Sequence, residues 1–209
     1  ERYTEAPTDS YQERREAIVK SAARRESGVF SELAKMAIGW WGRLDVTAME
    51  RTLTELTQRP LYPHGDLLGF LGMVERFGEE ADFPEALGDA IRDAALRARF
   101  DDEPTENESD EILMAASEVL AGQRYPRATF AASGETGAWH RRRGEERALA
   151  WMRERSTQGF CRGDAAVVFE AALLGLLHLV EFAEADEVWE MAAVLIDKLL
   201  FLLGTNAYQ

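Results

Sequence analysis

Apolar residues recur at intervals of three and four along most of the chain, and this spacing restricts the fold more than any other feature. It marks stripes over residues 29–41, 46–56, 67–77, 87–95 and 112–120. Such a period places the apolar residues on one face of an α-helix, whereas a half-buried strand needs strict alternation, which the sequence does not show. The sequence therefore predicts an all-α protein.

Capping and helix-breaking residues divide these stripes into separate helices. Asp45 stands where the N-cap of the second stripe belongs, and Pro60 follows the end of that stripe. The longest irregular stretch, 122–137, is long enough to be a candidate for function. After it we expect helices over 138–155, 164–182 and 186–203. The last two are apolar on almost every side, which is typical of helices that are buried on most sides.

About eight or nine helices joined by short connectors predict antiparallel helical hairpins. These hairpins could form an irregular bundle, an open solenoid or an arc of an (α/α) barrel. An arc leaves apolar edges that further helices or another chain must cover, so we expect identical copies to associate through such edges. We expect a single all-helical domain over residues 1–209, processed or excised from a longer chain, because the sequence begins with Glu1 rather than Met.

Charge and hydropathy exclude several classes of function. Against 38 Asp and Glu there are 24 Lys and Arg, and the net charge of −14 would repel the backbone of a nucleic acid. The longest apolar stretch, 165–180, is interrupted by Glu170 and His178 and is shorter than the roughly 20 residues of a membrane span. Cys161 is the only cysteine, so no internal disulfide can form. We expect a soluble protein, cytoplasmic or secreted after removal of a leader, that binds neither nucleic acid nor membrane.

Carboxylates are concentrated in residues 101–108, and closely spaced carboxylates can bind a hard cation or act in acid–base catalysis. The run Asp101-Asp102-Glu103 resembles the aspartate-rich motif of terpenoid synthases, which are also all-helical, although Pro104 ends any helix here. A metal-dependent enzyme of that type is one interpretation. The alternative interpretation is that this run is a solvated loop. Under this interpretation we expect neither a metal nor a cofactor.

His140 is the histidine with the most unusual surroundings. It lies in Trp139-His140-Arg141-Arg142-Arg143, a basic cluster within an acidic chain. The cluster could receive an anionic ligand such as a uronate carboxylate. Alternatively, its arginines could pair with Glu145 and Glu146 one turn along the same helix.

The tryptophans divide into two groups by position. Trp41 and Trp139 lie near predicted helix ends, where an indole ring could stack on a sugar. Trp40, Trp151 and Trp189 fall on apolar helical faces and are assigned to the core. His178 has leucine and valine neighbours, and we expect it to lie in the core or line a groove with a local hydrogen bond.

Five short motifs occur in a fixed order in the second half of the chain. They are Glu106-Asn107-Glu108, Leu120-Ala121-Gly122-Gln123, Ser133-Gly134-Glu135-Thr136-Gly137, Gly159-Phe160 and Asn206-Ala207-Tyr208. Their order resembles that of a group of largely uncharacterised bacterial proteins built on a helical toroid, similar in architecture to polysaccharide lyases and other (α/α) carbohydrate-active enzymes. The resemblance runs from about Ala95 to the last residue. The chain departs from the pattern at Glu108, Gly163 and Ala165, where the group has histidine, tryptophan and serine, and by shortening one linker to Thr105.

The resemblance implies an arc of helical hairpins belonging to an (α/α) toroid and a carbohydrate-active enzyme of lyase or glycosidase type that binds a poly- or oligosaccharide. Its catalytic residues would be Asn107, Glu108, His140 and Tyr208, and its substrate-binding residues Arg141, Trp139, Trp41 and Asp102. In a lyase, Asn107 and an arginine would neutralise a uronate carboxylate while His140 or Tyr208 removes the C5 proton. In a hydrolase, Glu108 would pair with a second acid. Because Glu108 replaces an imidazole, the alternative is a degenerate, non-catalytic helical scaffold that binds other proteins.

Overall fold

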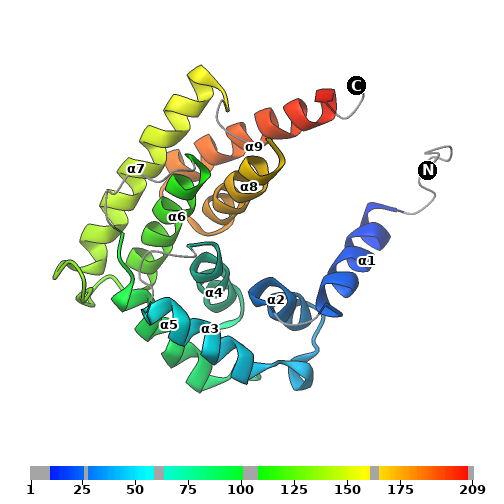
Figure 1. Ribbon diagram of the computed structural model, residues 1–209, viewed down its shortest axis with the longest axis vertical. Helices are drawn as coiled ribbons and strands as arrows, with labels where there is room; N and C mark the ends of the chain where they lie inside the picture. The colour runs from blue at the N-terminus through cyan, green and yellow to red at the C-terminus, as the bar shows by residue number, and fades with distance from the viewer. Residues whose placement is uncertain (1–9, 26–27, 59–63, 101–107, 161–164, 207–209) are drawn as a thin grey trace.

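The computed structural model describes residues 10–25, 28–58, 64–100, 108–160 and 165–206, and helices make up all of their regular secondary structure apart from one isolated bridge between Thr129 and Thr136 (Figure 1). The all-α prediction is confirmed. The elements are α1 (Tyr11–Ala23), α2 (Val29–Ala37), a 3-10 turn (Trp41–Arg43), α3 (Val46–Gln58), α4 (His64–Phe77), α5 (Glu85–Arg97), α6 (Glu108–Arg124), α7 (Gly137–Gln158), α8 (Ala165–Phe182) and α9 (Asp186–Asn206).

Local sequence sets most of these boundaries. The Asp45 carboxylate accepts a hydrogen bond from the Ala48 backbone N–H at 2.9 Å, so Asp45 caps α3 as predicted. Gly39 has a φ of +73°, a left-handed conformation that ends the predicted 29–41 helix early and leaves Trp41 on the 3-10 turn. The irregular stretch predicted over 122–137 is shorter in the structure. Helix α6 continues to Arg124, so the loop covers residues 125–136.

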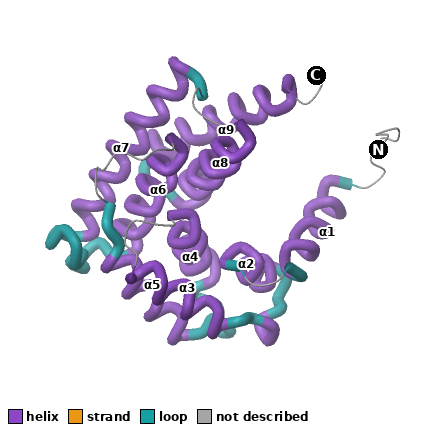
Figure 2. The backbone as a smooth tube through the Cα atoms, in the orientation of Figure 1, coloured by secondary structure: helices purple, strands orange, loops and turns teal. Residues whose placement is uncertain are grey.

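The helices follow one another around an open arc, with α1 and α9 on the two sides of the opening (Figures 1 and 2). In this view α2, α4 and α8 follow the inner side of the arc, and α3, α5 and α7 follow the outer side. Helix α6 packs against α4, α7 and α8, and α9 packs against α7 and α8. The two layers place the start of α7 beside the middle of α6, where the candidate site lies.

Two apolar clusters form the core, and α4 belongs to both. Its residues Leu67, Leu68 and Leu71 join the larger cluster, which is built mainly on α6, α8 and α9. On its other face, Phe70 and Met73 join a smaller cluster with α2, α3 and α5. Because successive turns of α4 bury side chains on both sides, this helix links the two halves of the arc.

One expectation about burial is wrong. The apolar pattern of 186–203 predicted a helix buried on most sides, but α9 leaves Val194 63%, Leu200 53% and Phe201 71% exposed. Trp189, assigned to the core, is 37% exposed, whereas Trp151 is buried as expected. The reason is the position of α9: it stands at one edge of the arc and packs on α7 and α8, so part of its apolar surface faces outward.

Among the described residues, no helix combines the length and the apolar character that crossing a bilayer requires.

Candidate functional site

The candidate site is a chain of hydrogen bonds centred on His140, in the first turn of α7. His140 Nδ1 lies 2.8 Å from Glu118 Oε1, and His140 Nε2 lies 2.7 Å from Ser133 Oγ. The imidazole and the carboxylate are buried, while Ser133 is exposed. A hydroxyl, an imidazole and a carboxylate are therefore joined in the order used by nucleophilic hydrolases.

The loop at residues 125–136 carries Ser133 to the imidazole. A hydrogen bond from the Phe130 N–H to the Glu135 carbonyl at 2.9 Å joins the two arms of the loop, and the turn between them passes through Gly134 with a φ of +74°. The Ala131 N–H donates to the carbonyl of Leu96 at 2.8 Å, which ties the loop to the end of α5. Glycine is required at the turn because a left-handed backbone disfavours other residues.

Glu118 is a fully buried carboxylate in the most apolar stretch of α6. Arg143 Nη1 donates to its Oε1 at 2.8 Å, and Arg147 Nη1 donates to its Oε2 at 3.0 Å. Both guanidinium groups also reach the carbonyl of Phe100, at 2.7 and 3.3 Å. These partners offset the cost of burying the charge, and they fix the carboxylate on the Nδ1 side of the imidazole.

The partners decide how the imidazole is protonated when it is neutral. An ionised carboxylate only accepts hydrogen bonds, so His140 Nδ1 carries the proton and donates to Glu118. Nε2 then holds the lone pair and accepts from the Ser133 hydroxyl. The Ser133 oxygen in turn accepts from the Glu135 backbone N–H at 3.1 Å. The result is a hydroxyl whose proton already points at a base.

Aromatic rings hold the imidazole in place and form part of a cavity beside it. The ring centroids of Phe130 and Phe100 lie 4.4 and 5.6 Å from that of His140, and Trp139 meets it edge-on at 4.9 Å. A cavity of about 330 Å³ is lined by Ala98, Phe100, Ala132, Ser133, Trp139, His140 and Arg143. The hydroxyl, the imidazole and one guanidinium therefore share a pocket with two large aromatic walls.

The structure brings some of the predicted site residues together and separates others. Trp139 and His140 both line the cavity. Arg141 is turned elsewhere: it pairs with Glu184 at 2.8 Å, and its Nε lies 3.6 Å from Glu145 Oε1. Trp41 belongs to the other half of the molecule, where it packs edge-on against Phe77 at 5.7 Å. Asn107, Asp102, Tyr208 and the Glu108 side chain lie outside the described residues.

Sequence reasoning missed Ser133, Glu118, Arg143 and Arg147 as members of one site. Ser133 lies in a motif that the sequence itself singles out, but its role depends on the loop that folds it back onto α7. The signal for the arginines was the helical period, since residues 140, 143 and 147 share one face of α7 whereas 141 lies on another. Glu118 offered a weaker signal, a single acid within an otherwise uncharged run from Ile112 to Ala121.

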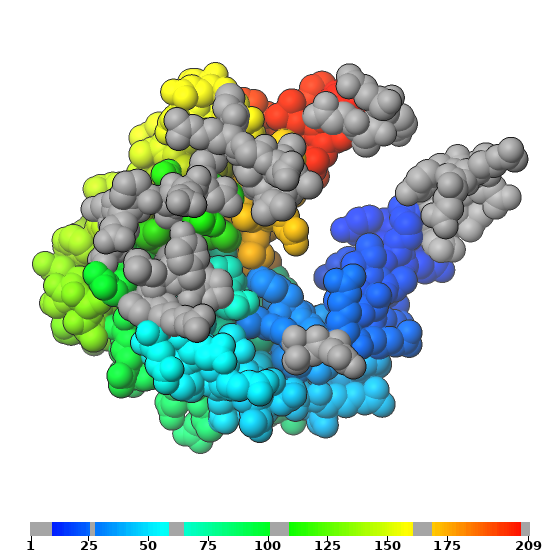
Figure 3. All heavy atoms as spheres, viewed as in Figure 1, coloured from blue at the N-terminus to red at the C-terminus, as the bar shows by residue number. Residues whose placement is uncertain are grey.

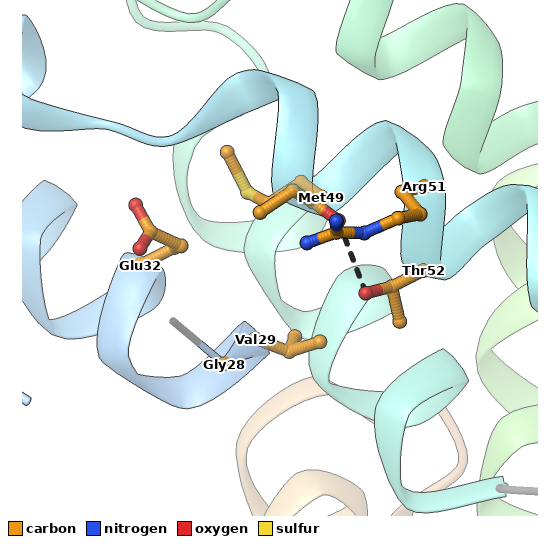
Figure 4. Close-up of a pocket in the computed structure, with 7 residues that line it drawn as sticks. Gly28, Val29, Glu32, Met49, Arg51 and Thr52 are labelled. Carbon is orange, nitrogen blue, oxygen red and sulfur yellow. Dashed lines mark hydrogen bonds between the residues drawn. The ribbon is translucent and has the colours of Figure 1, made fainter. Parts of the chain in front are cut away.

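A second hollow lies between α2 and α3 and is far smaller, at about 60 Å³ (Figure 4). Its buried Glu32 is already satisfied, by Lys35 at 2.6 Å and by the Asp45 N–H at 2.9 Å. Thr52 donates to the carbonyl of Ala48 within the same helix. This space accommodates only a few waters, and its charged group already serves the packing of α2 against the turn before α3.

Within the described part of the chain, no group of three or more His, Cys, Asp or Glu residues could hold a metal ion. The acidic run at 101–107 falls outside this statement because it is not described. Comparisons with protein-family models, with curated proteins and with solved structures gave no match.

Proposed function

We propose that the protein is a hydrolase of carboxylic esters that uses Ser133 as its nucleophile. The observation that supports this proposal is the continuous chain from Ser133 Oγ through His140 to Glu118, with hydrogen bonds of 2.7 and 2.8 Å, on the wall of the cavity. Serine at its ordinary acidity is a weak nucleophile, and an adjacent base that takes its proton is the usual means of activating it.

The reaction would proceed through an acyl-enzyme. Ser133 Oγ forms a bond to the carbonyl carbon of the ester while its proton passes to His140 Nε2. The tetrahedral intermediate then collapses, the bond to the alkoxide breaks, and Nε2 returns the proton to that leaving group. Water repeats the sequence in place of the alcohol, releasing the carboxylic acid and restoring the serine. Glu118 stabilises the imidazolium that exists between the two proton transfers.

The cavity limits the substrate to a small acyl group. Its volume of about 330 Å³ lies at the lower end of the range for ligand pockets. Phe100 and Trp139 supply apolar walls, and Arg143 supplies the positive charge on the same wall. We therefore expect short esters such as acetate and butyrate to react faster than long-chain esters.

The test uses p-nitrophenyl acetate and butyrate together with a fluorophosphonate probe that labels activated serines. The wild-type chain should hydrolyse both esters and take up one label. Ser133→Ala should lose the label and reduce turnover about 10³-fold or more, and His140→Gln should do the same. Ser156→Ala is the matched control, because Ser156 is an exposed serine at the other end of α7 whose hydroxyl bonds only within its own helix. Labelling that persists in Ser133→Ala would rule out the proposal.

A second candidate function, supported by the aromatic wall of the cavity, is action on a saccharide. Trp139 is half-buried there, with the Arg143 guanidinium carbon 5.4 Å from its ring centroid, an arrangement suited to stacking a sugar ring beside a cation. In this proposal the arc of helices is part of an (α/α) toroid, and His140 Nε2 removes the C5 proton of a uronate. The assay is a panel of acidic polysaccharides read at 235 nm for unsaturated products, and by reducing ends for hydrolysis.

The two candidates differ in how they depend on Ser133. Ester hydrolysis requires the Ser133 oxygen, so Ser133→Ala abolishes it. Proton abstraction by His140 does not require that oxygen, so the same variant would keep lyase activity. Silence in all three assays would leave the alternative of a non-catalytic helical scaffold, with the hydrogen bonds at His140 serving only to attach the loop to α6 and α7.

A further inference from the structure

The two edges of the arc carry opposite charge. Over residues 11–25, at the α1 edge, five basic side chains (Arg14, Arg15, Lys20, Arg24, Arg25) stand against two acidic ones. Over α9, at the other edge, four acidic side chains (Asp186, Glu187, Glu190, Asp197) stand against Lys198 alone. In a chain with a net charge of −14, the α1 edge is therefore a basic exception, although Glu16 pairs with Lys20 on the same helix.

Each edge also exposes large apolar side chains at the same helical interval. On α1, Tyr11 is 74% and Ile18 is 68% exposed; on α9, Val194 is 63% and Phe201 is 71% exposed. Both pairs are separated by seven residues, which is about 10.5 Å along a helix axis. Exposed apolar side chains grouped on one helix face mark an interaction surface rather than a solvated one.

The charges fall between the apolar residues in matching positions. Arg15 lies four residues after Tyr11 and three before Ile18, and Asp197 lies four residues before Phe201 and three after Val194. An antiparallel pairing of α1 with α9 therefore sets Tyr11 against Phe201, Ile18 against Val194, and Arg15 against Asp197 at one register. No described residue pairs with Arg15 or Asp197 in the single chain.

We infer that α1 of one copy docks antiparallel on α9 of a second copy of this chain. The two helices of one chain stand on opposite sides of the opening in the arc, as Figures 1 and 3 show. Because each copy offers both edges, the contact either closes in a two-fold dimer, where α1 and α9 of one copy meet α9 and α1 of the other, or continues head-to-tail into larger rings or filaments.

The experiment exploits the one charged pair that the register defines. Sedimentation equilibrium of the full chain should show a mass that rises with concentration above the 23.5 kDa monomer. Arg15→Glu places two acids opposite each other, and Asp197→Arg places two arginines opposite each other, so each variant alone should weaken association at least about tenfold. Glu50→Arg on α3 is the control, since it reverses an exposed charge away from both edges and should leave association unchanged.

An equimolar mixture of Arg15→Glu and Asp197→Arg chains is the decisive sample. In an alternating assembly every contact between the two variants is again between opposite charges, so association should return to the wild-type level. A wild-type chain that remains a monomer at every concentration would overturn the inference, as would closure of α1 onto its own α9, which leaves the mass unchanged. Reversals without effect, or a mixture without rescue, would overturn it as well.

Discussion

Gly122 determines how closely α6 and α7 can approach. A Cβ atom at this position would lie 2.4 Å from the backbone nitrogen of Arg141 and 2.6 Å from the carbonyl oxygen of Gly137. These are backbone atoms, so no side-chain rotation could relieve the contact. The helix that carries Glu118 and the helix that carries His140 therefore depend on the absence of a side chain here.

We predict that Gly122→Ala lowers the unfolding free energy by about 1–3 kcal/mol, because α6 and α7 must separate to admit the methyl group. The matched control is Gly204→Ala in α9, where a Cβ meets no atom within 4 Å and the higher helix propensity of alanine should stabilise slightly. Urea unfolding of both variants measures the difference. Equal unfolding free energies for the two variants would contradict the close packing of α6 on α7.

His178 gives the stability a dependence on pH. Burial lowers its pKa below the ordinary 6.5, against the opposing effects of its hydrogen bond to the Leu174 carbonyl and of Glu181. The unfolded chain therefore takes up a proton near pH 6.5 that the folded chain does not, and the unfolding free energy falls as the pH drops below that value. We predict a steeper fall between pH 7 and 5.5 for the wild type than for His178→Gln. The slopes come from urea unfolding at each pH, and parallel slopes would contradict the prediction.

The sequence predicts a site residue more readily when the residues that contact it are close to it in the chain. His140 was recognisable because its neighbours in the sequence are unusual, and His178 because its surroundings are local; its predicted local hydrogen bond is confirmed. Glu118 lies 22 residues from His140, and only the packing of α6 on α7 brings them together. Arg141 is next to His140 in the sequence but points to Glu184, whereas Arg143 shares the helical face of His140 and reaches Glu118.

At the scale of elements, α6 is the helix that organises the larger core. Gln123, near its end, bonds to the connection between α8 and α9 through both atoms of its amide. Its Nε2 donates to the carbonyl of Phe182 at 2.9 Å, and its Oε1 accepts from the Glu184 N–H at 3.1 Å. One side chain thus satisfies a carbonyl at the end of α8, which the helix itself leaves without a partner, and a backbone N–H in the connection that follows.

We predict that Gln123→Ala lowers the unfolding free energy by about 1–3 kcal/mol, because the partly buried carbonyl of Phe182 loses its partner, whereas the exposed N–H of Glu184 can bond to water. Gln12→Ala in α1 is the control, since Gln12 is exposed and bonds only to Glu16 at 3.4 Å. The measurement is again urea unfolding. A loss no greater than that of the control would show that water replaces the Gln123 amide without cost.

The predicted elements agree with the structure where the sequence carries its own signals. Asp45 and Pro84 mark the beginnings of α3 and α5, and the stripes fall on the buried faces of the helices. Helix α1 was missed because it has little apolar surface to show a period: residues 11–18 are all exposed. For α9 the apolar period correctly predicts a helix, but the prediction that this helix is buried is wrong. An apolar surface is buried only if another element covers it.

At the scale of the whole molecule, burial is greatest around α6, in the middle of the chain, and smaller at the two edges of the arc. Residues 112–121 of α6 are all buried between α4, α7 and α8, whereas α1 packs on α2 at the edge of the arc. Local opening costs least where few apolar contacts are lost. Stability should therefore be highest along α6 and lowest along α1, with α4 coupling the two cores.

Hydrogen–deuterium exchange tests this gradient and separates it from association. In dilute solution we predict the fastest helical exchange in α1 and the slowest in α6, because amides exchange through local opening. Docking of α1 on α9 of another copy would slow exchange in these two helices as the concentration rises, and it would leave α6 unchanged. Arg15→Glu should remove the dependence on concentration but keep the gradient. Fast exchange in α6 would contradict the packing itself, whereas a gradient without any concentration dependence would contradict only the docking of copies.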